Sequence, residues 1–311
     1  MRRFYFLIIF FVLSCSKKTD TTSPNPISPD AQYVIEKSPE FSIMSIQSII
    51  KPNIGGLMRT TFRDGFFVYQ YDSVISLKPC RDFADYPGVG YDTLDLDKDG
   101  VYNYTGIIFN CNGIDTISLD NILYEVNYSF IGYSFHRDSS DNDPYSFKLW
   151  FGYEGPFKMS VKSKNINTGD TLFNYVELKA FINSIKTSST TLTSYINREV
   201  YKTNPTNSCE PVTITNDTIN INFSNAPSWK PLKSFNQGEY ILAYLSSIGN
   251  VITCNNDTLN IRISTIDSLK ISLCSNKQDG PISGKLKLEI LNNGITKYIT
   301  YSDCKYSVGD N

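Results

Sequence analysis

Residues 116–135 read TISLDNILYEVNYSFIGYSF, a run rich in the Ile, Val, Tyr and Phe side chains that are typical of β-strands. Several such runs occur in the chain, and some alternate apolar and polar residues with the period of two that a half-buried strand requires. Asn-Gly and Asp-Gly pairs elsewhere suit turns that need a positive φ. The sequence therefore predicts an all-β fold of antiparallel β-sandwich modules. The further strand segments are 66–77, 145–153, 218–223, 240–248, 258–263 and 285–291.

The length and composition of the chain limit the number of domains. With 311 residues, of which 41% are hydrophobic, the chain can build one large domain or two ordinary ones. A change from dense aromatic residues to polar turns near residues 155–165 predicts a β-sandwich module over 33–157 and a second β-rich module over 158–311. The only helix that the sequence predicts lies at 176–185, and the Thr- and Ser-rich residues after it weaken the helical propensity.

Charge and histidine content exclude several classes of function. Charged residues make up 19% of the chain, with 29 Lys and Arg against 31 Asp and Glu, so the chain has no basic field to bind nucleic acid. His136 is the only histidine, and the sequence contains no GxSxG or HExxH motif. We therefore expect a non-catalytic protein. A hydrolase that assembles dispersed carboxylates across the fold is the alternative.

The first residues have the features of an export signal. Arg2 and Arg3 precede an apolar run over 4–13 that is too short to span a membrane as a helix, and Cys15 follows shortly afterwards. The pattern resembles the lipobox of bacterial lipoproteins, in which the cysteine is acylated and the leader is cleaved before it. This resemblance implies a lipoprotein signal peptide over 1–14 and lipidation of Cys15. An uncleaved anchor or an ordinary secretory signal is the alternative.

The segment after this cysteine is polar and rich in proline. Residues 16–32 include Pro24, Pro26 and Pro29 and contain few apolar side chains. A partly polyproline-like segment of this length spans up to roughly 50 Å at about 3.1 Å per residue. We therefore expect residues 15–32 to form a flexible tether that holds the folded part away from the lipid surface.

The number of cysteines fits an exported protein. Six remain when the lipidated cysteine is set aside, and an even number in an exported chain indicates disulfides. No CxxC motif is present, which disfavours zinc binding and redox catalysis. The sequence does not determine the pairing; Cys80 with Cys111 is the favoured single pair, and six buried free thiols are the alternative. The disulfide candidates are Cys80, Cys111, Cys209, Cys254, Cys274 and Cys304.

Residues 95–103 read DLDKDGVYN and carry the pattern of a calcium-binding loop. Side-chain oxygens stand at positions 1, 3, 5 and 9, and a glycine at position 6 allows the sharp turn. The segment differs from an EF-hand because Gly106 occupies position 12, so we expect Ca²⁺ in a structural role, pinning a hairpin. A solvated Asp/Gly turn is the alternative. The expected metal ligands are Asp95, Asp97, Asp99, Asn103 and the carbonyl oxygen of Val101.

Three features together suggest a family. The lipid cysteine, the proline-rich tether and the YDTLDLDKDGVYNY segment, residues 91–104, resemble lipoproteins of Bacteroidetes-type bacteria that carry a single DxDxDG loop. The resemblance covers the leader and about 30 residues near the loop. It implies an envelope protein that is lipid-anchored in the outer membrane or at the cell surface, and it leaves open whether the protein faces the periplasm or the exterior.

The expected partners follow from location and from exposed aromatic residues. Trp229 lies in the loop sequence NAPSWKPL, where it would stack on a sugar ring or, alternatively, close the end of a sandwich. We expect a membrane-anchored protein that binds a glycan or a protein through a calcium-stabilised β-sandwich. A structural component of an envelope complex is the alternative.

Overall fold

A computed structural model describes most of the chain from residue 104 onwards, together with one earlier segment. The described residues are 27–50, 104–119, 122–138, 145–152, 155–204, 206–207, 209–230, 235–275 and 279–310. They form α1 (Pro29–Ile50), β1 (Tyr104–Leu119), β2 (Ile122–Asp138), β3 (Phe147–Phe151), β4 (Phe157–Asn165), β5 (Thr171–Lys186), β6 (Thr191–Lys202), β7 (Val212–Asn222), β8 (Ile241–Ile252), β9 (Thr258–Leu273), β10 (Asp279–Ile290), the short 3-10 helix η1 (Leu291–Asn293), β11 (Ile295–Ser302) and β12 (Lys305–Gly309).

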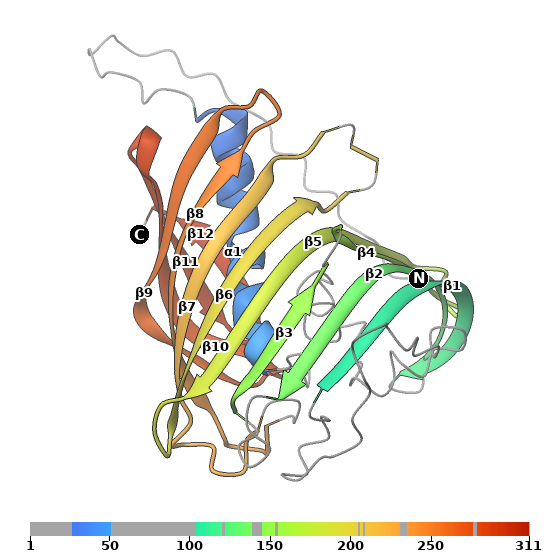
Figure 1. Cartoon of the computed structure of the whole chain (residues 1–311), viewed down its shortest axis with the longest axis horizontal. Coiled ribbons are helices and arrows are strands. Elements are labelled where there is room, and N and C mark those ends of the chain that lie inside the picture. The colour runs from blue at the N-terminus through green and yellow to red at the C-terminus, as the bar shows by residue number, and fades with distance from the viewer. Residues whose placement is uncertain are drawn as a thin grey trace, which may run out of the picture.

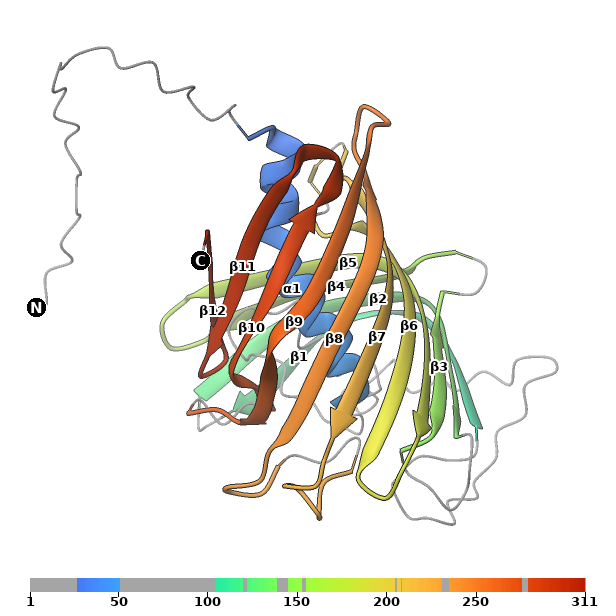
Figure 2. The same ribbon diagram turned by 90° about the vertical axis from the view of Figure 1, so that its left-hand side faces the viewer.

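The strands in these residues form one antiparallel sheet. The order is β1-β2-β3-β5-β6-β7-β8-β9-β10-β11-β12, and β4 pairs with β2 and β5 beside β3. The predicted all-β, antiparallel fold is confirmed, as a large open sheet consistent with a sandwich-type fold. The predicted module boundary between residues 157 and 158 falls at the start of β4, and strand pairing continues across it. Figure 1 and Figure 2 show that the sheet curves strongly around α1.

The concave side of the sheet holds the hydrophobic core. Along β6 the buried residues Leu192, Ile196 and Val200 alternate with outward-facing residues such as Tyr195 and Asn197. The same alternation runs along β7 and β8. Because successive side chains of a strand point to opposite faces, the inner face of each strand is apolar and the outer face contacts solvent.

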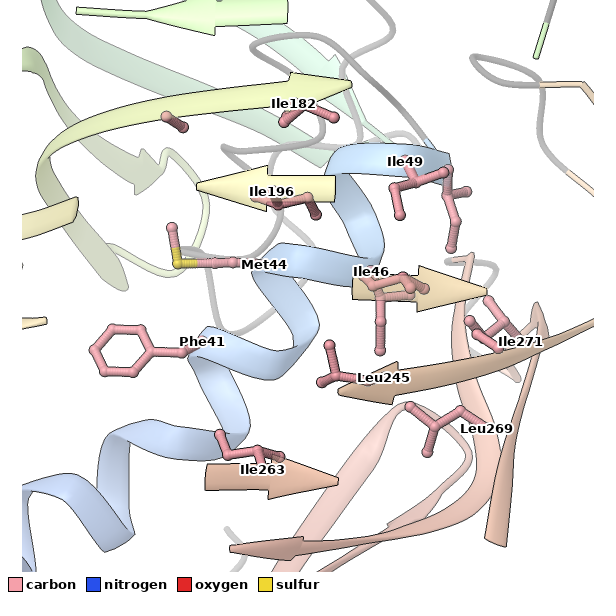
Figure 3. Packing of buried hydrophobic residues seen from close by; sticks show 14 of the residues in the cluster. Phe41, Met44, Ile46, Ile49, Ile182, Ile196, Leu245, Ile263, Leu269 and Ile271 are labelled. Carbon is pink, nitrogen blue, oxygen red and sulfur yellow. The ribbon is translucent and has the colours of Figure 1, made fainter. Parts of the chain in front are cut away.

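The helix α1 packs inside the curve of the sheet. Figure 3 shows Phe41, Met44, Ile46 and Ile49 of α1 among inward-facing side chains of the strands. Within the helix only Pro29, Gln32 and Glu36 are exposed, so α1 is a core element. A helix at this position was not predicted; its first residues lie inside the segment expected to be a flexible tether. The labelled strand residues in Figure 3 are Ile182, Ile196, Leu245, Ile263, Leu269 and Ile271.

Local interactions explain where α1 begins. The hydroxyl oxygen of Ser28 accepts a hydrogen bond from the backbone N–H of Ala31 at 3.2 Å, as an N-cap residue does. Pro29 occupies the first helical position, where its missing N–H costs nothing. Asp30 adds a negative charge at the positive end of the helix dipole. The Ser-Pro-Asp sequence therefore starts a helix, although the composition around it suggests a linker.

A proline lies inside α1 without ending it. Pro39 has no N–H to donate to the carbonyl oxygen of Ile35 one turn earlier. The hydroxyl of Ser38 donates to that oxygen instead, at 3.2 Å. The hydroxyl of Tyr301, on β11, donates to the carbonyl oxygen of Pro39 at 3.3 Å. The Ser38 hydroxyl thus replaces the hydrogen bond that Pro39 cannot make, and the Tyr301 hydroxyl ties the helix to β11.

The predicted helix at 176–185 is wrong. These residues lie within β5, which pairs with β3, β4 and β6. Leu178, Ala180 and Ile182 are buried at alternate positions, with Lys179 and Phe181 on the other face. The period of two therefore outweighs the weak helical propensity of the segment.

Two disulfides are present, formed by four of the six predicted cysteines. Cys209, before β7, is bonded to Cys254, after β8, and Cys274, after β9, is bonded to Cys304 in the turn between β11 and β12. The prediction of disulfides is confirmed for these four cysteines. Because consecutive strands are antiparallel, the two bridges stabilise opposite ends of the sheet. The favoured pair Cys80–Cys111 lies outside the residues that the structure describes, apart from the backbone of Cys111 on β1.

Candidate functional site

Nine of the outward-facing side chains of β6, β7 and β8 form a regular array, which we call the neutral face and which ends on β6 before Glu199. Neighbouring residues in the strand register form three rows of three across the sheet. The rows are Thr193–Asn220–Tyr244, Tyr195–Thr218–Ser246 and Asn197–Asn216–Ile248.

No residue of the neutral face is charged. Tyr195 is 50% exposed, Tyr244 is 45% exposed and Ile248 is 57% exposed, and these are the largest side chains of the array. The other six carry amide or hydroxyl groups, which both donate and accept hydrogen bonds. One such bond, from the Thr193 hydroxyl to the Asn220 side-chain oxygen, measures 2.8 Å. The neutral face therefore offers aromatic rings surrounded by uncharged hydrogen-bonding groups.

A buried ion pair lies directly behind the neutral face. Arg198 and Asp217 follow Asn197 and Asn216 in the sequence and point to the concave side, where their side chains are 3% and 1% exposed. The Arg198 Nη2 atom lies 3.5 Å from the Asp217 Oδ2 atom. Ser247, on β8, donates to Asp217 Oδ1 at 2.5 Å. Three strands of the neutral face are thus joined by one polar network on their inner side.

This network also includes the helix. The hydroxyl of Ser45 on α1 donates to Asp217 Oδ2, and the Arg198 guanidinium lies 5.9 Å from the centre of the Phe41 ring. Burial lowers the pKa of Arg198, and the charge of Asp217 opposes this shift. The Arg198 Nε atom has no hydrogen-bond partner among the described residues. Arg198 and Asp217 therefore depend on each other, because neither charge is solvated.

The structure places Trp229 in the core, at 1% exposure, rather than at the surface. Its ring lies 5.8 Å from Phe223 and 6.1 Å from Phe235, measured between ring centres. The hydroxyl of Tyr145 donates to the Trp229 carbonyl oxygen at 2.6 Å. Trp229 is therefore not available to stack on a ligand at the surface, and it closes one end of the core, as the alternative interpretation has it.

A carboxylate fixes the residues around this tryptophan. The Ser228 hydroxyl donates to Glu239 Oε1 at 2.7 Å, and the backbone N–H of Asn236 donates to Glu239 Oε2 at 3.1 Å. These hydrogen bonds, with the Ser228 hydroxyl the strongest cause, lower the pKa of Glu239 below its usual value. The ionised form of Glu239 thus stabilises the backbone conformation around Ser228 and Asn236.

Other predicted site residues lie outside the described part of the chain. They are Cys15, the loop Asp95–Asn103 and Cys80. Among the residues that the structure does describe, no group of three or more His, Cys, Asp or Glu side chains is arranged to hold a metal ion. Also within these residues, no helix has both the length and the apolar character that crossing a membrane demands.

Comparisons of the chain with protein-family models, with curated proteins and with solved structures find no match. The candidate site therefore depends on the geometry alone. The neutral face was not predicted from the sequence, although two of its three strands were predicted in part. The signal was available in the alternate residues 193, 195 and 197 and in 216, 218 and 220, all of them Thr, Tyr or Asn.

Proposed function

We propose that the protein is a non-catalytic, lipid-anchored envelope protein that binds an uncharged glycan on the neutral face. The observation that carries this proposal is the absence of charge from all nine residues of an array that exposes Tyr195 and Tyr244. Rings of this kind pack against the apolar faces of sugars, and the amides and hydroxyls between them match sugar hydroxyls.

The spacing of the two tyrosines favours an oligosaccharide. Tyr195 and Tyr244 are two strands apart and offset by two residues along the strand direction. With about 4.8 Å between strands and about 3.4 Å per residue, the two positions lie about 12 Å apart. Thr218 and Asn220 of β7 lie between them. A ligand that contacts both rings also passes over these polar groups, so a chain of sugars fits better than a single ring.

The location of the protein is part of the same proposal. The leader, Cys15 and the polar residues that follow it support a lipid anchor in the outer membrane or at the cell surface. The loop Asp95–Asn103 supports a structural calcium ion close to the start of β1. Both features come from the sequence, and neither is needed for the neutral face to bind a glycan.

A glycan array probed with the full-length protein tests the proposal. We expect binding of neutral oligosaccharides that falls about 5- to 30-fold in Tyr195→Ala and in Tyr244→Ala, because each substitution removes an aromatic ring worth about 1–2 kcal/mol. Phe173→Ala is the matched control, since Phe173 is an equally exposed ring outside the neutral face, at 51% exposure. Equal losses in all three variants, or no bound glycan at all, would contradict the proposal and favour a structural component of an envelope complex.

A further inference from the structure

A second outward-facing region lies on β1, β2, β4 and β5, and we call it the basic patch. One cross-strand row runs from Ile114 through Asn127 and Lys162 to Phe173. Lys164 follows on the same face of β4. At the nearby sheet end, the backbone N–H of Ile166 donates to the carbonyl oxygen of Leu123 at 3.0 Å, so these two residues are neighbours. The basic patch consists of Ile114, Leu123, Lys162, Lys164, Ile166 and Phe173.

The apolar residues of the basic patch are strongly exposed. Ile114 is 69% exposed, Phe173 is 51%, Ile166 is 48% and Leu123 is 45%. Inward-facing residues on the same strands, such as Met159 at 1%, fill the core. Single exposed apolar residues are ordinary, but a group on one surface indicates an interaction site.

The basic patch holds two lysines beside one exposed carboxylate, Glu125, on the same face of β2. The cross-strand neighbours of Lys162 are Asn127 and Phe173, neither of which is charged. Lys164 lies opposite Glu125, yet among the described residues no ion pair involves either lysine. Lys158, on the same face of β4, is instead paired with Glu177 at 3.7 Å. Positive charge beside exposed apolar side chains is the combination that an anionic lipid surface attracts.

We propose that the basic patch docks on an anionic membrane surface, with Lys162 and Lys164 at the lipid phosphates and Phe173, Ile114, Leu123 and Ile166 at the boundary of the acyl chains. The proposal rests on the lipid anchor of the proposed function for its choice of partner, because an anchored protein remains close to a bilayer.

Docking on this region leaves the neutral face free. The curvature of the sheet turns the outer faces of β1 and β2 away from those of β7 and β8 (Figures 1 and 2). A protein that lies on the bilayer through the basic patch therefore presents the neutral face away from the lipid. The anchor alone would hold the protein near the membrane without fixing its orientation.

Vesicle binding tests the proposal without the anchor. The full chain with Cys15→Ser is mixed with vesicles of phosphatidylcholine alone or of phosphatidylcholine with phosphatidylglycerol, and binding is measured by co-sedimentation. We expect binding only to the phosphatidylglycerol vesicles, reduced about 25-fold by Lys162→Gln with Lys164→Gln, since each lysine near an anionic surface strengthens binding about fivefold. The matched control is Lys297→Gln with Lys305→Gln, at the opposite edge of the sheet, which should leave binding unchanged.

A second measurement reports which surface touches the lipid. Phe173→Trp and Ile248→Trp place a reporter in the basic patch and in the neutral face, and lipids with a quencher on the acyl chain are added. We expect quenching of the indole at position 173 only. Equal binding to both vesicle types, equal losses in the two lysine double variants, or quenching at position 248 alone would overturn the proposal. Failure of the lipid anchor is detected separately, by mass spectrometry of the wild-type Cys15, and leaves these vesicle measurements unaffected.

Discussion

The outer face of β6, β7 and β8 and the outer face of β1, β2, β4 and β5 belong to one sheet but differ in charge. The neutral face holds nine uncharged residues, whereas the basic patch sets Lys162 and Lys164 among exposed apolar side chains. Both regions alternate with inward-facing residues that build the core, so folding does not require either composition. The two proposals above rest on this difference: an uncharged glycan is proposed for one region and an anionic lipid surface for the other.

The largest expected effect is a loss of stability when the buried ion pair behind the neutral face is broken. In Asp217→Ala the Arg198 guanidinium stays buried without a counter-charge, and we expect the free energy of unfolding to fall by about 3–5 kcal/mol. Lys162→Ala, on the exposed basic patch, should change it by less than about 0.5 kcal/mol. Denaturant unfolding followed by circular dichroism measures both.

The double variant Arg198→Met with Asp217→Leu is the control for this comparison. Replacing both charges by apolar residues of similar size removes the uncompensated charge, so most of the stability lost in Asp217→Ala should return. A double variant as unstable as Asp217→Ala would mean that packing, rather than charge, supports the neutral face.

The second largest effect is expected from removing the Cys209–Cys254 disulfide beside the neutral face. Cys209→Ala with Cys254→Ala removes the bond between the segments that flank β7 and β8, and we expect a loss of about 2–4 kcal/mol in the free energy of unfolding. Glycan binding should weaken, because the strands that carry the neutral face lose a constraint. Vesicle binding should stay unchanged under native conditions; a parallel loss of both would show that the two regions are not independent.

Calcium should stabilise the region that carries the basic patch. The predicted loop Asp95–Asn103 comes just before β1, the first strand of the region with the basic patch. At about 100 times its dissociation constant, calcium should raise the free energy of unfolding by about 2.7 kcal/mol relative to chelator. Asp97→Ala should remove that difference in a thermal unfolding experiment. Equal melting of wild type and variant with calcium and with chelator would contradict a metal site.

The smallest expected effect depends on pH. The pKa of Glu239 is lowered in the folded protein, so its contribution to stability is present above the usual pKa of a glutamate and is lost as the pH falls through the lower folded value. Wild type should therefore melt at a higher temperature than Glu239→Gln near neutral pH, and the two curves should converge in acid. If the melting temperatures of wild type and Glu239→Gln still differ in acid, the packing of the side chain, and not its charge, causes the difference.

The sequence predicts the strands better than it predicts the helix. The period of two in segments such as 218–223 and 258–263 follows directly from one buried face, and both segments lie in strands except for Phe223, which directly follows β7. α1 is buried around much of its surface and carries serines inside the core, so it has no amphipathic pattern to recognise. Segment 176–185 was misassigned because short apolar runs fit either structure until strand pairing decides between them.

The candidate site was harder to predict for a related reason. Trp229 stands out in the sequence because tryptophan is rare and a Pro lies nearby, but its exposure depends on its packing with Phe223 and Phe235. The neutral face, in contrast, consists of common residues whose meaning depends on the register of three strands. Register between strands is a tertiary property, so only the structure brings Tyr195 and Tyr244 onto one surface.

The position of α1 has a consequence for biosynthesis. The hydroxyl of Tyr301 reaches the carbonyl oxygen of Pro39 across 262 residues of sequence, and the Gln47 side-chain amide donates to the carbonyl oxygen of Asp279 at 2.6 Å across 232 residues. The helix emerges from the ribosome first, and the strands that cover it emerge last. Contacts of such long range form slowly, because the intervening chain must be ordered before they can form. The apolar residues of α1 therefore stay without their partners on β10 and β11 until the end of translation.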